Sequence, residues 1–218
     1  MCVATTIAME FNVVNPFYLV LDWGMVFQKF QIWRLVTCFF VIGGFSWSFL
    51  MRVILIHNYG VGLEKGVFQF KTAEFVYMLL VGGATLLAIS LALPGFNLIV
   101  LNGPFVFMIL YVWSKHYPTQ SVSIMGLFQV QGFYLPWAFL MINMVLGGSP
   151  WQDLFGIFTG HLHYFLTELN PNTRHHMEPP ELVHKLVAWT NAGPPSQRQA
   201  PTRPAGVFRG RGQRLGGN

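Results

Sequence analysis

The sequence predicts an all-α protein that crosses a membrane several times, with a membrane domain over residues 1–169 and a tail over residues 170–218. The first observation is composition: 53% of the residues are hydrophobic and 10% are charged, whereas a soluble domain carries about a quarter charged residues. The second is a series of apolar runs close to the length of about 20 residues that a helix needs to cross a bilayer. These runs lack the alternating pattern of membrane β-strands.

The residues before the first full span favour an interfacial or re-entrant loop. Residues 12–44 are apolar but contain Asp22, Lys29 and Arg34, which fits a loop better than a span. Trp33 with Arg34 is expected to anchor the loop at headgroup level, with Lys29 and Arg34 reaching outward to water and phosphate. The preceding segment is too short to cross a bilayer. Either the chain begins inside a truncated first helix, which is the favoured interpretation, or its N-terminus is translocated unaided.

Five helical spans are predicted, over residues 45–63, 73–93, 96–113, 124–146 and 151–169. Short turns rich in Pro and Gly, at 94–95 and 147–150, make the spans on either side antiparallel. The connections at 60–72 and 114–123 carry basic residues, and the tail carries seven basic residues against two acidic ones. The positive-inside rule therefore places these connections and the C-terminus in the cytosol.

Arg52 lies well inside the first of these spans, about 10 Å along its helix at 1.5 Å per residue. A central arginine costs about 2.5–3.5 kcal/mol on the insertion scale, so its side chain should face protein or water. Two interpretations stay open for Arg52: a functional role, and a structural ion pair for which Glu74 is the candidate partner.

The last span carries Gly156 and Gly160, a GxxxG pair that lets two helix backbones approach closely, and packing is the favoured role. His161 follows, and an intramembrane serine protease would place a nucleophile beside such a base. The sequence has no Gly-x-Ser-Gly, and the corresponding helix, over residues 96–113, reads Leu-Asn-Gly-Pro at 101–104 and contains no serine. His161 is therefore predicted to be a hydrogen-bonded packing residue rather than a catalytic one.

No metal or cofactor site is predicted. Cys2 and Cys38 lack the spacing of a zinc site and are not expected to form a disulfide. His161 and His163 are two residues apart, so their side chains diverge on a helix.

The tail begins with a predicted amphipathic helix suited to the cytosolic leaflet. Its apolar stripe consists of Leu182, Val183, Leu186, Val187 and Trp189, with Lys185 on the opposite side. A linker rich in Pro, Gln, Ala and Arg follows over residues 193–206.

The chain ends in two apolar residues, Phe208 and Leu215, separated by glycines and arginines. One interpretation is an RGG-like RNA-binding segment. The other is a peptide that docks in an extended conformation on a protein partner, with glycines that allow close backbone approach.

Five blocks, in this order and spacing, resemble the Derlin family of rhomboid-like proteins without proteolytic activity, and plant members in particular. They are FQIWRLVT at 30–37, YGVGLEKG at 59–66, LYVWSKHYP at 110–118, FYLPWAF at 133–139 and GHLHYFLT at 160–167. The resemblance runs from about Asn15 to the C-terminus and implies a rhomboid-like helix bundle with an apolar luminal loop.

The resemblance also implies roles for particular residues. The family's Trp-Arg motif corresponds to Trp33 and Arg34, and its GxxxG to Gly156 and Gly160. A polar lateral groove would be lined by Arg52, Asn102 and Asn143. A box similar to the SHP box, which binds the valosin-containing AAA ATPase, is formed by Phe208, Gly210, Gly212, Arg214, Leu215 and Gly216.

By this resemblance the protein is a non-catalytic component of degradation at the endoplasmic reticulum (ER) and of the unfolded protein response. It would help to move misfolded proteins to the cytosol, with a ubiquitin ligase complex, the ATPase, membrane lipid and further Derlin copies as partners, and no nucleic acid. The alternatives are a channel, transporter or scaffold unrelated to degradation, and an intramembrane serine protease. Deletion of the tail distinguishes a channel, transporter or scaffold from the degradation role, because only the degradation role requires the tail.

Overall fold

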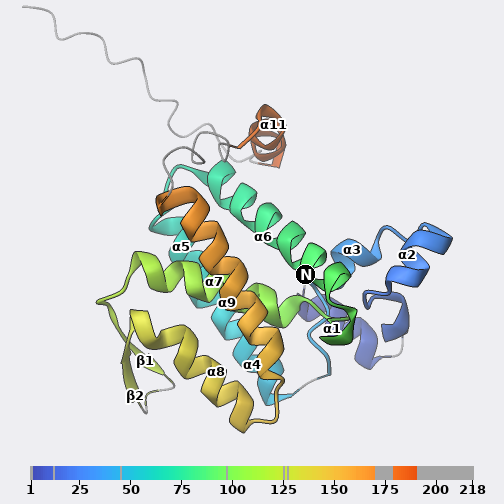
Figure 1. The fold of residues 1–218 in the computed structure, drawn as a ribbon, viewed down its shortest axis with the longest axis horizontal. Helices are drawn as coiled ribbons and strands as arrows, with labels where there is room; N and C mark the ends of the chain where they lie inside the picture. The colour runs from blue at the N-terminus through green and yellow to red at the C-terminus, as the bar shows by residue number, and fades with distance from the viewer. Residues whose placement is uncertain are drawn as a thin grey trace, which may run out of the picture.

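The computed structural model describes residues 2–11, 13–44, 46–96, 98–124, 126, 128–169 and 179–190. It is a helical bundle with a smaller N-terminal region on one side and a short hairpin on the other (Figure 1). The described residues contain one sheet, of two antiparallel strands. The fold is therefore all-α, as the composition predicted.

The N-terminal region, residues 2–44, contains short helical segments joined by turns. They are α1 (Cys2–Glu10), η1 (Pro16–Tyr18), α2 (Trp23–Lys29) and α3 (Arg34–Thr37). Asp22 begins α2 by accepting a hydrogen bond from the Met25 amide. The region joins the bundle through backbone hydrogen bonds from Leu21 N to Ile99 O and from Leu101 N to Cys38 O. The segment expected to be a loop is thus an ordered set of helical turns.

The first predicted span after this region is one continuous helical path. It consists of α4 (Trp47–Leu55), a π-helical turn η2 (Ile56–Gly60) and α5 (Val61–Lys65). Ser46 caps the start of α4 by accepting from the Phe49 amide. A π-turn widens the helix locally and is frequent at functional sites.

Helix α6 (Thr72–Ala92) has 21 residues and a mean hydropathy of 2.1. Among the described residues it is the one uninterrupted α-helix that is both long and apolar enough to cross a bilayer. Only 28% of its apolar window is buried, so most of its residues keep some exposed surface.

The helix expected over residues 96–113 begins later, because α7 runs from Asn102 to His116. The preceding residues form the 3₁₀ turn η3 (Pro94–Phe96) and an extended segment that hydrogen-bonds to the N-terminal region. Pro104 falls in the first turn of α7, where proline's missing N–H costs no hydrogen bond.

The helix expected over residues 124–146 is also shorter. Strands β1 (Ser121–Ile124) and β2 (Phe128–Gln131) form a hairpin, followed by η4 (Gly132–Tyr134) and α8 (Leu135–Val145). Apolar and polar residues alternate along β1, and Gly126 adopts a positive φ of 76° in the turn. Local alternation therefore overrides the overall hydrophobicity of this segment.

Helix α7 is the centre of the bundle, and twelve of its fifteen residues are buried. It packs most extensively against α9 (Pro150–Tyr164), which continues into the π-helical turn η5 (Phe165–Leu169). Figure 1 shows α9 crossing α7, with α4 and α8 beside them. The last described element, α11 (Glu181–Thr190), packs against α6.

Candidate functional site

Helices α9 and α7 approach each other closely at Gly156 and Gly160 of α9. A Cβ added at Gly156 would lie 2.7 Å from Cβ of Phe107 and would also overlap the Pro104 carbonyl. A Cβ added at Gly160 would lie 2.9 Å from Cβ of Tyr111. Both glycines therefore face α7, and their missing side chains set how closely the two helices approach.

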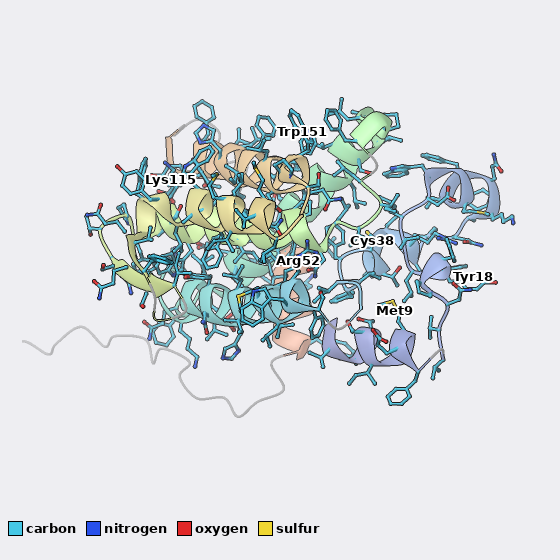
Figure 2. The ribbon with its side chains drawn as sticks, turned by 90° about the horizontal axis from the view of Figure 1, so that it is seen from below. Met9, Tyr18, Cys38, Arg52, Lys115 and Trp151 are labelled. Carbon is cyan, nitrogen blue, oxygen red and sulfur yellow. The ribbon has the colours of Figure 1, made fainter. Side chains whose placement is uncertain are left out.

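Arg52 projects from α4 toward the start of α7. A Cβ added at Gly103 would lie 3.2 Å from an Nη atom of Arg52, so the guanidinium lies directly over this glycine. In Figure 2 Arg52 lies among the helices, whereas Tyr18 lies at the edge of the N-terminal region. The arginine is half-buried, which agrees with the expectation that it faces protein rather than lipid.

Arg52 lines a small cavity of about 30 Å³ between α4 and α8. Its other lining side chains are mainly apolar, and Asn143 of α8 is the second strongly polar one. Asn143 donates a hydrogen bond of 2.6 Å from its Nδ2 to Asp153. Two of the residues predicted to line a groove, Arg52 and Asn143, thus line the same small cavity.

Asp153 is the residue of this cluster that the sequence analysis missed. It is fully buried on α9, and its charge interacts with that of Arg52. Glu74, the partner suggested for Arg52, pairs instead with Lys71 at 2.9 Å, so that suggestion is wrong. A signal was present in the sequence, because Asp153 lies three residues before Gly156 and so on the same helix face.

Asn102, predicted to line a groove with Arg52 and Asn143, does not line this cavity. Its side chain is buried and donates a 2.6 Å hydrogen bond to the Phe39 carbonyl, which ties the start of α7 to the N-terminal region. The cavity beside Arg52 is lined by residues of α4, α7 and α8, while Asn102 connects the start of α7 to the N-terminal region.

Trp33 and Arg34 have opposite environments. Arg34 is 4% exposed, and its guanidinium donates hydrogen bonds of 2.6 and 2.7 Å to the carbonyls of Phe17 and Val20 and one of 2.6 Å to Gln31. The expectation that Arg34 reaches outward is therefore wrong, because its fork of donors holds the loop together internally. Trp33 is half-exposed.

The N-terminal region carries many exposed apolar side chains. Those more than half exposed are Phe11, Val13, Phe17, Tyr18, Phe27, Phe30, Ile32, Trp33 and Val36. A surface of this composition is suited to lipid rather than water.

His161 is hydrogen-bonded as expected: its Nδ1 lies 2.8 Å from the Tyr111 hydroxyl. Within the described ranges no three His, Cys, Asp or Glu side chains are grouped to hold a metal ion. Cys38 is buried, and desolvation raises the pKa of its thiol to about 12, which keeps the thiol protonated and unreactive.

The predicted tail features are only partly described. In α11, Val183 is buried against the bundle, whereas Leu182 and Trp189 are largely exposed. The helix thus uses one side of its apolar stripe for protein contact. The segment from Phe208 to Gly216 lies outside the described residues.

Comparisons with known proteins agree with this helical architecture. A family model described as the Der1-like family matches residues 1–180. Derlin-1 of Oryza sativa subsp. japonica is 43% identical over 99% of this chain and 91% of its own length. Derlin-1.1 of Zea mays is 42% identical, also over 99% of this chain and 91% of its own length. Derlin-1 of Arabidopsis thaliana is 42% identical over 92% of this chain and 76% of its own length.

Proposed function

The chain belongs to the Der1-like family of polytopic helical membrane proteins, and we propose from this membership that it assists the export of misfolded proteins from the ER to the cytosol. The Derlin names of its relatives associate the chain with ER-associated degradation. In this proposal the protein is a non-catalytic component of the ER membrane, with its C-terminus in the cytosol.

The observation that carries the proposal is the polar cluster of Arg52, Asn143 and Asp153 between α4, α8 and α9. An ionisable side chain inside a membrane is costly and normally marks a pathway or a binding site. Here the cluster adjoins the cavity between α4 and α8. A polar segment of a misfolded protein could exchange its hydrogen bonds with water for bonds to these groups, which lowers the barrier to entering the bilayer.

A binding role also fits the chemistry of the three side chains better than catalysis does. A guanidinium, an amide and a carboxylate supply hydrogen-bond donors and acceptors, but none of them is the hydroxyl or thiol nucleophile of an acyl-transfer enzyme. The exposed apolar N-terminal region would insert beside the groove and disturb lipid order there, which shortens the path across the bilayer.

The force for export would come from a motor bound to the tail. Phe208 and Leu215 would anchor the SHP-like box on the valosin-containing AAA ATPase, with Gly210 and Gly212 allowing backbone pairing and Arg214 meeting an acidic rim. A ubiquitin ligase complex and further Derlin copies would complete the assembly.

A degradation assay tests both parts of the proposal in cells lacking their own Derlins. Asn143→Leu should stabilise a misfolded ER substrate while ATPase capture persists. Phe208→Ala should stabilise the same substrate and weaken ATPase capture about tenfold or more, as loss of a buried anchor does. Asn58→Leu and Gln213→Ala are the matched controls, and each should behave as wild type.

The proposal fails if the substrate is degraded at the wild-type rate in both variants at equal protein levels. The docking role of the tail fails separately if the wild-type tail peptide binds RNA in preference to the ATPase, with the steep salt dependence of phosphate contacts.

A further inference from the structure

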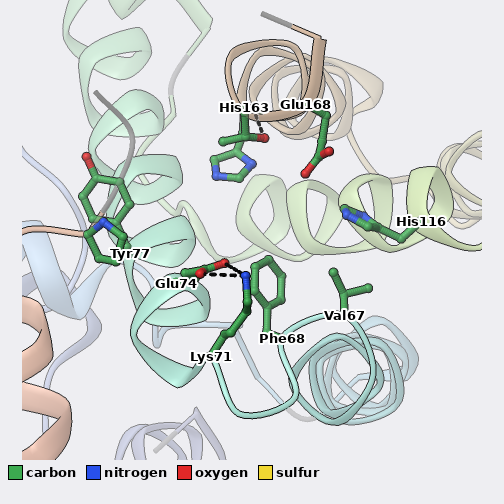
Figure 3. A pocket seen from close by; sticks show the side chains of 10 residues that line it. Val67, Phe68, Lys71, Glu74, Tyr77, His116, His163 and Glu168 are labelled. Atoms are coloured by element: carbon green, nitrogen blue, oxygen red, sulfur yellow. Dashed lines mark hydrogen bonds and ion pairs between the residues drawn. The ribbon is translucent and has the colours of Figure 1, made fainter. Parts of the chain in front are cut away.

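A second cavity, of about 490 Å³, lies where α6 begins and where α7 and η5 end. This volume is within the range of about 300–1,000 Å³ that small-molecule sites occupy. Figure 3 shows His163 and Glu168 on one side of the cavity and the Lys71–Glu74 pair on the other, with His116 beside them. None of these groups takes part in the groove between α4 and α8.

Among the described residues, each of the two histidines of this cavity has a ring nitrogen for which the structure shows no hydrogen-bond partner. His116 Nδ1 lies 2.9 Å from the Val112 carbonyl, which can only accept, so Nδ1 carries the proton and Nε2 of the neutral ring is an acceptor. His163 is 9% exposed, and its Nδ1 has no hydrogen-bond partner within the described ranges. A buried nitrogen left in this state is destabilising unless a ligand satisfies it.

The charges around the cavity suit a ligand with both signs. Glu168 is exposed and forms no ion pair with another described residue, so its carboxylate is available to a cation. Across the cavity Lys71 supplies a cation, partly balanced by Glu74 at 2.9 Å, and Tyr77 adds a hydroxyl. A zwitterion would place its positive end at Glu168 and its negative end at Lys71.

The position of the cavity relative to the bilayer limits the candidate ligands further, to groups found at the membrane surface. Its residues come from the first turns of α6, the one helix of spanning length in the described part of the chain, and from the ends of α7 and η5. The end of a spanning helix lies at the level of the lipid headgroups.

We propose that this cavity binds phosphoethanolamine, presented by an ethanolamine phospholipid of the membrane. The primary ammonium offers three N–H donors, which match the Nε2 atom of His116, the carboxylate of Glu168, and the Nδ1 atom of His163 in the tautomer that carries its proton on Nε2. A trimethylammonium of choline offers no donor and would leave both imidazole nitrogens unsatisfied. The phosphodiester lies toward Lys71 and Tyr77.

The test reconstitutes the full-length protein with equal amounts of phosphatidylethanolamine, phosphatidylcholine and phosphatidylserine, followed by native mass spectrometry of the retained lipid. Wild type should retain phosphatidylethanolamine in preference to the other two lipids. Glu168→Gln should reduce that preference about tenfold, because a charge-assisted hydrogen bond is lost. Glu64→Gln, an exposed carboxylate outside the cavity, should retain it.

Soluble glycerophosphoethanolamine separates the two sources of the same chemistry. Displacement of the lipid by this compound supports recognition of the headgroup alone, and retention against it supports recognition of the whole lipid. Equal retention of phosphatidylcholine, preferential retention of phosphatidylserine, or a Glu168→Gln variant with the wild-type preference would overturn the proposal. Degradation activity does not enter this measurement, so the outcome is independent of the proposed export function.

Discussion

The N-terminal region and the α7-centred bundle contain the same apolar residue types but are held together by different interactions. Trp33 is half-exposed on the first, whereas Trp113 of α7 is 6% exposed, with its ring centroid 4.9 Å from that of Tyr59. The bundle depends on close side-chain packing around α7. The N-terminal region depends on polar side chains that bond backbone carbonyls, above all Arg34 and Thr37.

This difference shows how one chain combines a closely packed helical bundle with a region that exposes apolar side chains. The bundle encloses α7 in apolar side chains and holds Arg52, Asn143 and Asp153 close together. The N-terminal region leaves many apolar side chains exposed, because hydrogen bonds from Arg34 and Thr37 to backbone carbonyls add to its few buried apolar contacts. A small shared core that includes Leu21, Cys38, Leu86 and Leu101 joins the two.

The largest expected effect is a difference in the free energy of unfolding between substitutions of Trp113 and of Trp33. Trp113→Ala should lower the free energy of unfolding in detergent micelles by about 4 kcal/mol, since it removes a buried ring from the core. Trp33→Ala should change it by less than about 0.5 kcal/mol. Equal losses in the two variants would show that the N-terminal region is packed in the same way as the bundle.

A second substitution tests the glycine contact that defines the bundle. Gly156→Ala should destabilise the protein by about 2–3 kcal/mol, because the new methyl group overlaps α7. Gly60 is also helical but has nothing within 4 Å of an added Cβ, so Gly60→Ala should leave the melting temperature unchanged or raise it. If both variants melt alike, the α9–α7 approach is not limited by Gly156.

A smaller effect is expected within the N-terminal region. Arg34→Lys keeps the charge but loses the planar fork, so it should cost about 2 kcal/mol and increase amide hydrogen exchange around residues 17–20. The exposed Lys29 is the control, and Lys29→Arg should change neither quantity. Wild-type exchange in the Arg34 variant would mean that other contacts hold this loop.

Prediction from sequence worked best where a property is local. Composition and the apolar runs predicted the membrane class, and the five sequence blocks predicted the family that the comparisons then showed. The spacing of Gly156 and Gly160 predicted that one helix face is suited to close packing. It did not indicate α7 as the helix that packs there, since small residues mark a face but carry no information about its partner.

The predictions for Arg34 and for the partner of Arg52 were wrong because the surroundings of both side chains depend on contacts between segments distant in sequence. Arg34 was expected at the headgroups because an arginine near a membrane normally reaches water, yet two carbonyls some fifteen residues earlier enclose it. The partner of Arg52 was sought at Glu74, on the next span in sequence, whereas the charge that interacts with Arg52 is that of Asp153 on α9.

The sequence by itself determined the membrane class, the helical character of the chain, the approximate positions of three of the five spans and the family, because hydrophobicity and motif spacing are properties of neighbouring residues. Only the tertiary structure decided that α7 is enclosed while α6 remains mostly open, that 121–131 is a hairpin, and that Asn143 and Asp153 meet near Arg52. The physical reason is that apolar helices look alike in hydropathy. Which of them becomes buried depends on the shapes and polar groups that other helices bring to it.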